Sequence, residues 1–234
     1  KAVRTAVERI APTASRVLIS GPNGSGKELA ARCIHHQSDR NDSRFIVANC
    51  ARLGAERADV ELFGSDGVAT SRRIVGLFEQ AHKGTLYFDE VCDLPLETQG
   101  KIVRAVAEQR FRRVGGNKEV SVDVRVISAS SRDLSAAIAE GRLREDLYYR
   151  LGVVPLSMPP LTERREDIPH LARHFVDLVA RRTGLGKVKL GDEVLSAMQG
   201  YRWPGNVRQM LNTIENMLIM APADRSEPLG LDLL

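Results

Sequence analysis

Short apolar runs recur along the first part of the chain, bounded by glycine, proline or polar residues. Runs of this length are typical of buried strands, so they predict strands at 17–20, 45–48, 86–88, 124–129 and 153–156. Helical segments separate them, and in the helix predicted at 97–109 the residues Ile102, Val103 and Val106 share one face. Strands that alternate with helices predict an α/β fold, in which helices cover both faces of a parallel sheet and ligands bind at the carboxyl ends of the strands.

The pattern changes after Pro159 and Pro160, because no further strand-like run follows. Helices are predicted at 166–182, 192–199 and 206–221. The last of these carries an apolar stripe at helical spacing, made of Val207, Met210, Leu211, Ile214, Met217 and Leu218. We therefore expect an α/β subdomain at residues 1–160 and a small all-helical lid subdomain at residues 161–234.

A glycine-rich segment lies between the first predicted strand and a run of helix formers that begins at Glu28. Glycines let a loop fold around an anion with its N–H groups turned inward, the helix adds the positive end of its dipole, and a lysine can reach the β- and γ-phosphates of a nucleotide. A plain glycine-rich turn would not need these flanking elements, so we expect a phosphate-binding loop. The predicted cofactor-binding residues are Gly21, Pro22, Asn23, Gly24, Ser25, Gly26, Lys27, Glu28 and Leu29. Glu28 stands where a Mg²⁺-binding serine or threonine is usual.

A second apolar strand, within Thr85-Leu86-Tyr87-Phe88, ends in the acids Asp89 and Glu90. In nucleoside triphosphatases, the first acid of such a pair holds Mg²⁺ directly or through its water, and the second orients and deprotonates the attacking water. Two adjacent acids could instead form a solvated turn. Their place after a buried-type strand, downstream of a phosphate-binding loop, favours catalysis. We expect Asp89 to be the Mg²⁺ ligand, Glu90 the base, and a nucleoside triphosphate the bound ligand.

Composition limits the other possibilities. The chain has 234 residues, 43% of them hydrophobic, and a formal net charge of +4, which suits one large α/β domain or one domain with a small appendage. No apolar run approaches a membrane span, and Cys33, Cys50 and Cys92 lack the spacing of a zinc site or a disulfide framework. We expect a cytoplasmic protein with reduced cysteines and no membrane partner. The basic residues form no long block, so these residues are not expected to bind DNA. His35 and His36 are expected at the surface.

Ordered motifs along nearly the whole chain resemble those of the AAA+ ATPases and, within them, the NtrC family of bacterial enhancer-binding proteins, which activate σ54 RNA polymerase. These motifs are the glycine-rich loop through Glu28, Glu61-Leu62-Phe63-Gly64, Gly84 to Glu90, Arg125-Val126-Ile127-Ser128, Arg144-Glu145-Asp146-Leu147, Tyr149-Arg150-Leu151 and Trp203 to Arg208. The resemblance implies a P-loop AAA+ core with a helical lid and ATP at their junction. It also accounts for Glu28, which is common after the lysine in this family.

The resemblance implies roles for three residues around the nucleotide. Asn49, after the second predicted strand, is similar to the switch residue that hydrogen-bonds the catalytic Glu90 and releases it according to the state of the γ-phosphate. Ser131 occupies the place of a γ-phosphate sensor, where its short hydroxyl reaches less far than the residues usual in the family. Arg208 lies off the apolar stripe of its helix and is similar to the lid's contact to bound nucleotide.

The resemblance also identifies Arg144 and Arg150 as arginine fingers, which would reach the γ-phosphate of a neighbouring subunit and make hydrolysis a property of a ring. From spacing alone, a solvated basic helix is the favoured interpretation. Its leucines at 143, 147 and 151 would pack inward while both guanidinium groups project outward.

One departure from the family follows Gly64. Activators of this family continue into a G-A-F-T-G-A loop with an aromatic tip that grips σ54, whereas this chain continues with Ser65-Asp66-Gly67-Val68-Ala69-Thr70 and is a few residues shorter. Val68, Ala69 and Thr70 are the candidates for the tip, and they offer little apolar area. NtrX-type response regulators of some bacteria also lack this loop, and the stretch 84–114 resembles theirs.

Three functions of different classes are compatible with a nucleotide site. The first is an oligomerising AAA+ module of a two-component transcriptional regulator, in which nucleotide controls a ring or smaller oligomer. The resemblance implies a receiver domain before it, which meets a sensor kinase, and a helix-turn-helix domain after it, which binds DNA; neither lies in this chain. The alternative is an ATPase that remodels σ54 RNA polymerase holoenzyme directly. The loop after Gly64 favours the first function, without direct σ54 contact. A nucleic-acid motor has only the weak support of Arg72-Arg73.

Overall fold

The computed structural model describes residues 2–67, 72–186, 188–221 and 228–231, so the tip candidates Val68, Ala69 and Thr70 lie outside the described residues. The chain divides into two compact units. One contains Lys1–Gly21 and Lys27–Met158, and the other contains Pro22–Gly26 and Pro159–Leu234. Most of the glycine-rich loop therefore groups with the helical residues, although the chain enters and leaves it through the α/β unit.

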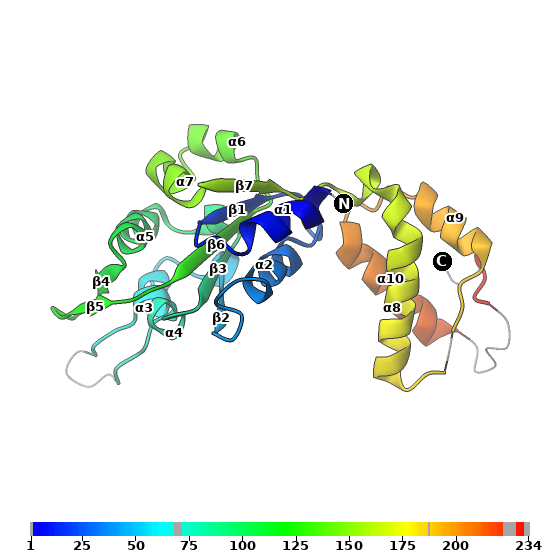
Figure 1. Ribbon diagram of the computed structural model, residues 1–234, viewed down its shortest axis with the longest axis horizontal. Helices are drawn as coiled ribbons and strands as arrows, with labels where there is room; N and C mark the ends of the chain where they lie inside the picture. Colours follow the sequence, from blue (N-terminus) through cyan, green and yellow to red (C-terminus); the bar gives the residue numbers. More distant parts are fainter. Residues whose placement is uncertain (1, 68–71, 187, 222–227, 232–234) are drawn as a thin grey trace. The chain divides into compact units, whose positions relative to one another are not determined.

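The α/β unit is built on a five-stranded sheet in which all strand pairs are parallel. Its strands, in the spatial order β2-β3-β6-β1-β7, are β1 (Val17–Ser20), β2 (Phe45–Asn49), β3 (Thr85–Asp89), β6 (Arg125–Ser130) and β7 (Val154–Ser157) (Figure 1). The five predicted strands and the parallel α/β fold are confirmed, with strand ends within one residue of the prediction.

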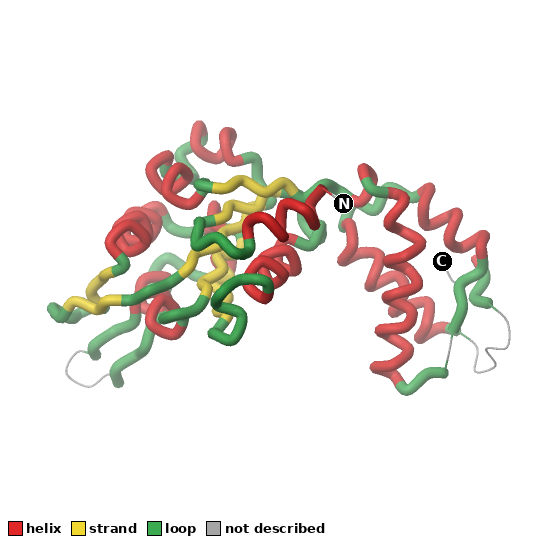
Figure 2. Tube along the Cα trace, in the orientation of Figure 1, coloured by secondary structure: helices red, strands yellow, loops and turns green. Residues whose placement is uncertain are grey.

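Helices cover both faces of this sheet (Figure 2). One face packs on α1 (Ala2–Ile10) and α2 (Lys27–His36). The opposite face carries the helices α3 (Ala58–Phe63), α4 (Leu77–Gln80), α5 (Leu96–Glu108), α6 (Leu134–Ala139) and α7 (Glu145–Leu151). Side chains alternate along β1, so Val17 and Ile19 pack toward the first face and Leu18 toward the second. Burial of each such side chain contributes about 1.5–3 kcal/mol to folding.

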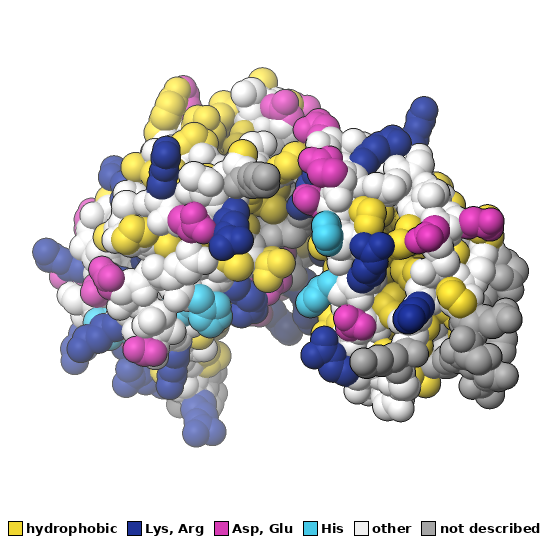
Figure 3. All heavy atoms as spheres, turned by 45° about the vertical axis from the view of Figure 1, so that its right-hand side comes forward, with side chains coloured by type: hydrophobic (Ala, Val, Ile, Leu, Met, Phe, Trp, Pro, Cys, Tyr) yellow, Lys and Arg dark blue, Asp and Glu magenta, His cyan; other side chains and the backbone are white. Residues whose placement is uncertain are grey.

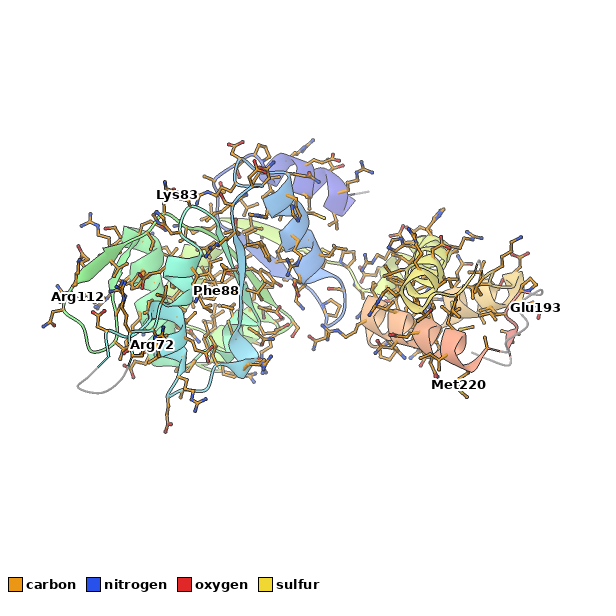
Figure 4. All side chains as sticks on the ribbon, turned by 90° about the horizontal axis from the view of Figure 1, so that it is seen from below. Arg72, Lys83, Phe88, Arg112, Glu193 and Met220 are labelled. Atoms are coloured by element: carbon orange, nitrogen blue, oxygen red, sulfur yellow. The ribbon has the colours of Figure 1, made fainter. Side chains whose placement is uncertain are left out.

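The sequence pattern missed a two-stranded antiparallel hairpin made of β4 (Arg110–Arg112) and β5 (Glu119–Ser121). Its strands are three residues long and mostly exposed, so they carry no buried apolar run. Figure 4 shows Arg112 at the outer edge of the α/β unit, whereas Phe88 of β3 lies in its interior. The hairpin is thus a surface projection and not a part of the main sheet.

Helix α1 was also missed, and its last turn depends on a distant residue. Arg125, at the start of β6, donates hydrogen bonds from Nη1 to the Ala11 carbonyl at 2.9 Å and from Nη2 to the Ile10 carbonyl at 3.0 Å. The last carbonyls of a helix have no partner within it, and a cation there also interacts favourably with the helix dipole. A tertiary contact therefore satisfies the carbonyl groups at the end of this helix.

The helical unit contains the three predicted helices, α8 (Ile168–Thr183), α9 (Asp192–Gly200) and α10 (Asn206–Met220), after the 3-10 turns η3 (Leu161–Glu163) and η4 (Arg165–Asp167). The predicted apolar stripe of α10 packs against α8, in an apolar cluster that also includes residues of α9. Trp203 is buried there and donates from Nε1 to the Met198 carbonyl at 2.7 Å. In the residues described here, no helix combines the length and apolar character needed to cross a membrane.

The two neighbouring histidines of α2 differ from the prediction. His36 is exposed as expected, but the expectation of a surface position was wrong for His35, which is 2% exposed. His35 Nδ1 lies 2.9 Å from the Thr85 hydroxyl, and Nε2 donates to the Ser43 carbonyl at 3.2 Å. Burial is the main cause that lowers the pKa of His35. The ring is therefore a neutral structural link between α2 and β3.

Candidate functional site

Parallel strands bring their carboxyl ends to one edge of the sheet, and the predicted residues of the α/β unit gather at that edge. Ser20 of β1 pairs with Ser130 of β6, and Asn49 of β2 pairs with Asp89 of β3. The N–H of Gly21 donates to the Ser130 carbonyl at 3.2 Å, so the glycine-rich loop leaves the sheet beside the end of β6. Residues far apart in the chain thus meet at one end of the sheet.

Lys27 lies at the centre of this edge. Its side chain is 6% exposed, and Nζ donates to the Gly21 carbonyl at 2.9 Å and lies 3.2 Å from Oε1 of Glu90. The ammonium group therefore links the two predicted motifs, the glycine-rich loop and the acidic strand end. A buried lysine held by a carbonyl and a carboxylate is already oriented for a second anion, such as a phosphate.

Ser131 binds the second carboxylate oxygen of Glu90. Both the N–H and the hydroxyl of Ser131 donate to Oε2 of Glu90, each at 2.8 Å. The backbone of Glu90 has φ of 55°, a left-handed conformation that is uncommon outside glycine. Asn49, the predicted partner of Glu90, is exposed, and no hydrogen bond joins the two side chains in the part of the chain that the structure describes. Ser131, predicted as a sensor of phosphate, thus contacts the predicted base.

Asp89 occupies the end of β3, half-buried, and accepts a hydrogen bond from the Tyr87 hydroxyl at 3.0 Å on Oδ1. Burial is the largest influence and raises the pKa of Asp89, while the bond from Tyr87 opposes it. A divalent cation close to the carboxylate would favour its charged form. Mg²⁺ commonly takes one or two protein carboxylates together with phosphate oxygens and water, so a single carboxylate at the strand end fits this ion.

The glycine-rich loop makes close contacts with the start of α10 inside the helical unit. Asn206 donates from Nδ2 to the Asn23 carbonyl at 2.9 Å, and the N–H of residue 207 donates to the Gly24 carbonyl at 3.0 Å. Gly24 has φ of 73°, and a Cβ there would lie 2.2 Å from the Gly205 carbonyl oxygen and 3.1 Å from the Arg208 Cβ. Only glycine fits at position 24, and the predicted lid arginine, Arg208, starts from a point directly against the loop.

Two further residues at the loop were not singled out from the sequence. Arg164, between η3 and η4, donates from Nη2 to the Ser25 carbonyl at 2.7 Å, and burial lowers the pKa of Arg164. Asn206 Oδ1 accepts a hydrogen bond from the Leu161 N–H at 2.7 Å, in addition to the hydrogen bond that Asn206 donates to the loop. The motif from Trp203 to Arg208 was visible in the sequence, but no local pattern connected Arg164 or Asn206 to residues more than a hundred positions away.

The remaining loop residues differ in burial. Ser25 is 1% exposed, and its hydroxyl oxygen is buried without a hydrogen-bond partner in the described residues. Leu29 is 67% exposed on α2. Glu28 is also exposed and pairs with Arg32 one turn later, at 2.7 Å. The unsatisfied Ser25 hydroxyl is a free donor within the loop, whereas Glu28 and Leu29 face outward.

Arg144 is the N-cap residue of α7 and Arg150 lies in its last turn, and the predicted leucines at 143, 147 and 151 are buried. Arg144 is held by Asp146, with Nε to Oδ1 at 3.0 Å and Nη2 to Oδ2 at 2.8 Å. Arg150 is half-buried, and within the described residues its side chain has no hydrogen bond or ion pair. One predicted finger thus pairs with an acid of its own helix, whereas the other has no ion pair among the described residues.

The base of the segment after Gly64 is well connected, although its tip lies outside the described residues. Ser65 and Ile74 exchange backbone hydrogen bonds at 2.9 and 2.8 Å. Arg113 of the hairpin turn, 8% exposed, holds this base with a double hydrogen bond to Glu79 at 2.7 and 2.6 Å and a bond to Asp66 at 2.9 Å. The hydrogen bonds to Glu79 are the main cause that raises the pKa of Arg113.

Comparison with known proteins identifies the family. Residues 1–157 match the family of the sigma-54 interaction domain, and residues 162–232 match the AAA+ ATPase lid domain. The chain belongs to the sigma-54 interaction domain family. It is 50% identical over 222 residues to the nitrogen assimilation regulatory protein NtrX of Azorhizobium caulinodans. This alignment covers 95% of this chain and 49% of that protein. It is 42% identical to the response regulator protein PilR of Pseudomonas aeruginosa, over 100% of this chain and 53% of PilR.

Solved structures of this family agree with the fold. NtrX from Brucella abortus superimposes with a TM-score of 0.93 and 46% identity, over 100% of this chain and 53% of that one. The same protein has been solved with ADP (TM-score 0.93, 46% identity, 100% and 52% covered) and with ATP (TM-score 0.92, 46% identity, 100% and 54% covered). The AAA+ fold is therefore confirmed. The resemblance to the NtrC family, and within it to NtrX-type regulators, is confirmed as well. The chain spans about half the length of the curated relatives it matches.

Proposed function

We propose that this sigma-54 interaction domain binds ATP and ADP and acts as a nucleotide-controlled module of a two-component transcriptional regulator. The observation that carries the proposal is the buried Lys27, 3.2 Å from Glu90 and bonded to the first residue of the glycine-rich loop. The NtrX structures with ADP and ATP support it, because that protein is 46% identical over the whole of this chain. N–H groups of the loop and the Ser25 hydroxyl would receive the phosphates.

Mg²⁺ belongs to the same proposal. Asp89 would hold the ion, directly or through water, and the ion would neutralise charge on the phosphates during hydrolysis. Glu28 stands in the place of the usual hydroxyl ligand, but it faces outward and pairs with Arg32, so Asp89 would be the main protein ligand.

Glu90 would act as the base that deprotonates the attacking water. In the present arrangement Lys27 holds one oxygen of Glu90 and Ser131 holds the other. A γ-phosphate would compete for both donors, because it is an anion that lysine and a serine hydroxyl also bind. We propose that nucleotide binding frees Glu90 in this way, with Ser131 as the sensor and Asn49 as the switch residue that receives the freed carboxylate.

Hydrolysis would depend on a second copy of the chain. Arg150, which has no partner in the described part of its own subunit, would reach the γ-phosphate of a neighbour, together with Arg144 once it leaves Asp146. Arg208 would contact the nucleotide from the lid. In the whole protein, we propose a receiver domain that responds to a sensor kinase and a helix-turn-helix domain that binds DNA, as the response-regulator relatives suggest.

Replacement of Lys27 tests nucleotide binding. Lys27→Ala should weaken the affinity for both ATP and ADP, measured by calorimetry with Mg²⁺, by about 10- to 150-fold, since each charge-assisted contact to phosphate is worth about 1.5–3 kcal/mol. Lys118→Ala, at an exposed position of the hairpin turn, is the matched control and should bind normally. Unchanged affinity in Lys27→Ala would remove the glycine-rich loop from the proposal.

The alternative function is direct remodelling of σ54 holoenzyme, which the name of the matched family favours. A grip on σ54 needs an apolar or aromatic tip, and Val68, Ala69 and Thr70 offer little area for it. We therefore expect no stable complex with σ54 in the presence of a metal-fluoride analogue of ATP, and no open promoter complex. Gel shift and transcription with purified σ54 holoenzyme measure both; co-migration or an open-promoter signal would favour the alternative.

The surface of the domain bears on a third possibility. On the face shown in Figure 3, basic and acidic side chains are interspersed and form no continuous basic stripe. A nucleic-acid motor needs such a stripe to follow a phosphate backbone. Neither this face nor the mild net charge of +4 favours that function.

A further inference from the structure

The α/β unit has a cavity of about 400 Å³ at the amino ends of β1, β6 and β7. This volume is within the range of small-molecule pockets, about 300–1,000 Å³. Its wall contains two arginines, Arg16 and Arg125, and four valines, Val106, Val124, Val126 and Val153. The remaining lining residues are uncharged, so the cavity has two cations and no acid in its wall.

Arg16 precedes β1 and has an unsatisfied guanidinium group. Its Nε atom is buried without a hydrogen-bond partner, and its side chain forms no ion pair within the residues that the structure describes. Its backbone carbonyl accepts a hydrogen bond from the Val154 N–H at 3.1 Å, which fixes Arg16 beside the start of β7. Burial lowers the pKa of Arg16, and the nearby Arg150 adds to this effect.

Arg125 is 3% exposed and carries a second unsatisfied group. Its two Nη atoms bond carbonyls of α1, but its Nε atom is also buried without a partner. Burial is the main cause that lowers the pKa of Arg125, and Arg40 contributes. The carboxylate of Asp123 does not form an ion pair with Arg125, since Asp123 pairs with Arg40 at 2.6 Å. Asp39 raises the pKa of Arg125, but less than burial and Arg40 lower it, so an anion in the cavity would offset part of the cost of burying this charge.

We propose that this cavity binds a small organic anion, a carboxylate or phosphate on a short apolar body. Arg16 and Arg125 receive the anionic group, because both line the cavity and their positive charge attracts an anion, and the valines contact the apolar body. The glycine-rich loop begins at the opposite, carboxyl end of β1. The anion and the nucleotide therefore occupy separate places and do not compete.

Thermal unfolding with defined probes tests this site. The probes are butyrate, butyl phosphate, inorganic phosphate and uncharged butanol, each added to the chain in saturating ADP so that the glycine-rich loop is occupied. At ten times the dissociation constant, butyrate or butyl phosphate should raise the unfolding midpoint by about 3–6 °C. Arg16→Gln should abolish the shift, and it should fold because the side chain it replaces has no partner among the described residues. Arg9→Gln, at an exposed position of α1, should retain the shift.

The outcomes separate this site from the nucleotide site. The same shift in Lys27→Ala without ADP would support the cavity even if nucleotide binding failed. Methyl NMR should show the signals of Val124, Val126 and Val153 moving on titration with butyl phosphate. Equal stabilisation of wild type and Arg16→Gln, no shift with either organic anion, or an equal effect of butanol would overturn the proposal. If inorganic phosphate stabilised the chain as much as butyl phosphate does, the proposed contact between the valines and an apolar body would be wrong.

Discussion

Replacing Glu90 with glutamine should reduce ATP turnover by about 10²- to 10⁴-fold, the range that a positioned general base contributes. The amide keeps the shape of the carboxylate but cannot accept the proton of water. ATP and ADP should bind as tightly as before or somewhat more tightly, because Lys27, now 3.2 Å from the Glu90 carboxylate, would no longer be held by an ion pair. Phosphate release and calorimetry measure the two effects.

Two variants sharpen this experiment. Glu97→Gln changes an exposed acid of α5 in the same way and should leave turnover unchanged. Ser131→Ala removes the hydroxyl donor to Glu90 and keeps the N–H donor, so it should change turnover by only about 2- to 13-fold, the worth of one hydrogen bond. If Glu90→Gln retained full turnover, another group would activate the water and the role of Glu90 would be wrong.

Arg150→Ala and Arg144→Ala should each lower hydrolysis by about 10³-fold or more while leaving nucleotide affinity nearly intact, since an arginine finger stabilises charge mainly in the transition state. The fingers would act across subunits, so the wild-type activity per subunit should rise with protein concentration. Turnover measured against concentration, together with light scattering in ATP and in ADP, tests both statements.

Arg142→Ala is the matched control for the fingers. Arg142 lies just before α7, is exposed and pairs with Glu140, so its loss should have little effect on hydrolysis. Activity per subunit that stays constant with concentration, in a protein that remains monomeric, would contradict the assignment of Arg144 and Arg150. It would leave the nucleotide site itself in place, because Lys27 and Glu90 meet within one chain.

Local patterns were sufficient for most of the fold. Buried strands appear as apolar runs, and helices with one buried face repeat at a helical period, so the five sheet strands and the helices α5, α8, α9 and α10 were predictable. The glycine-rich loop was equally visible, because a helix start and a backbone that must approach phosphate require glycines at fixed offsets. These features are encoded in neighbouring residues, and neighbouring residues are what a sequence pattern compares.

Contacts between distant residues were decided only by the tertiary structure. The register of β3 and β6 places Ser131 on Glu90, whereas Asn49, at the end of the adjacent strand, makes no bond to it among the described residues. The burial of His35 depends on Thr85, fifty positions away. The unsatisfied cations Arg16 and Arg125 are likewise visible only in the folded chain, because a charge is known to lack a partner only after every neighbouring element has been packed.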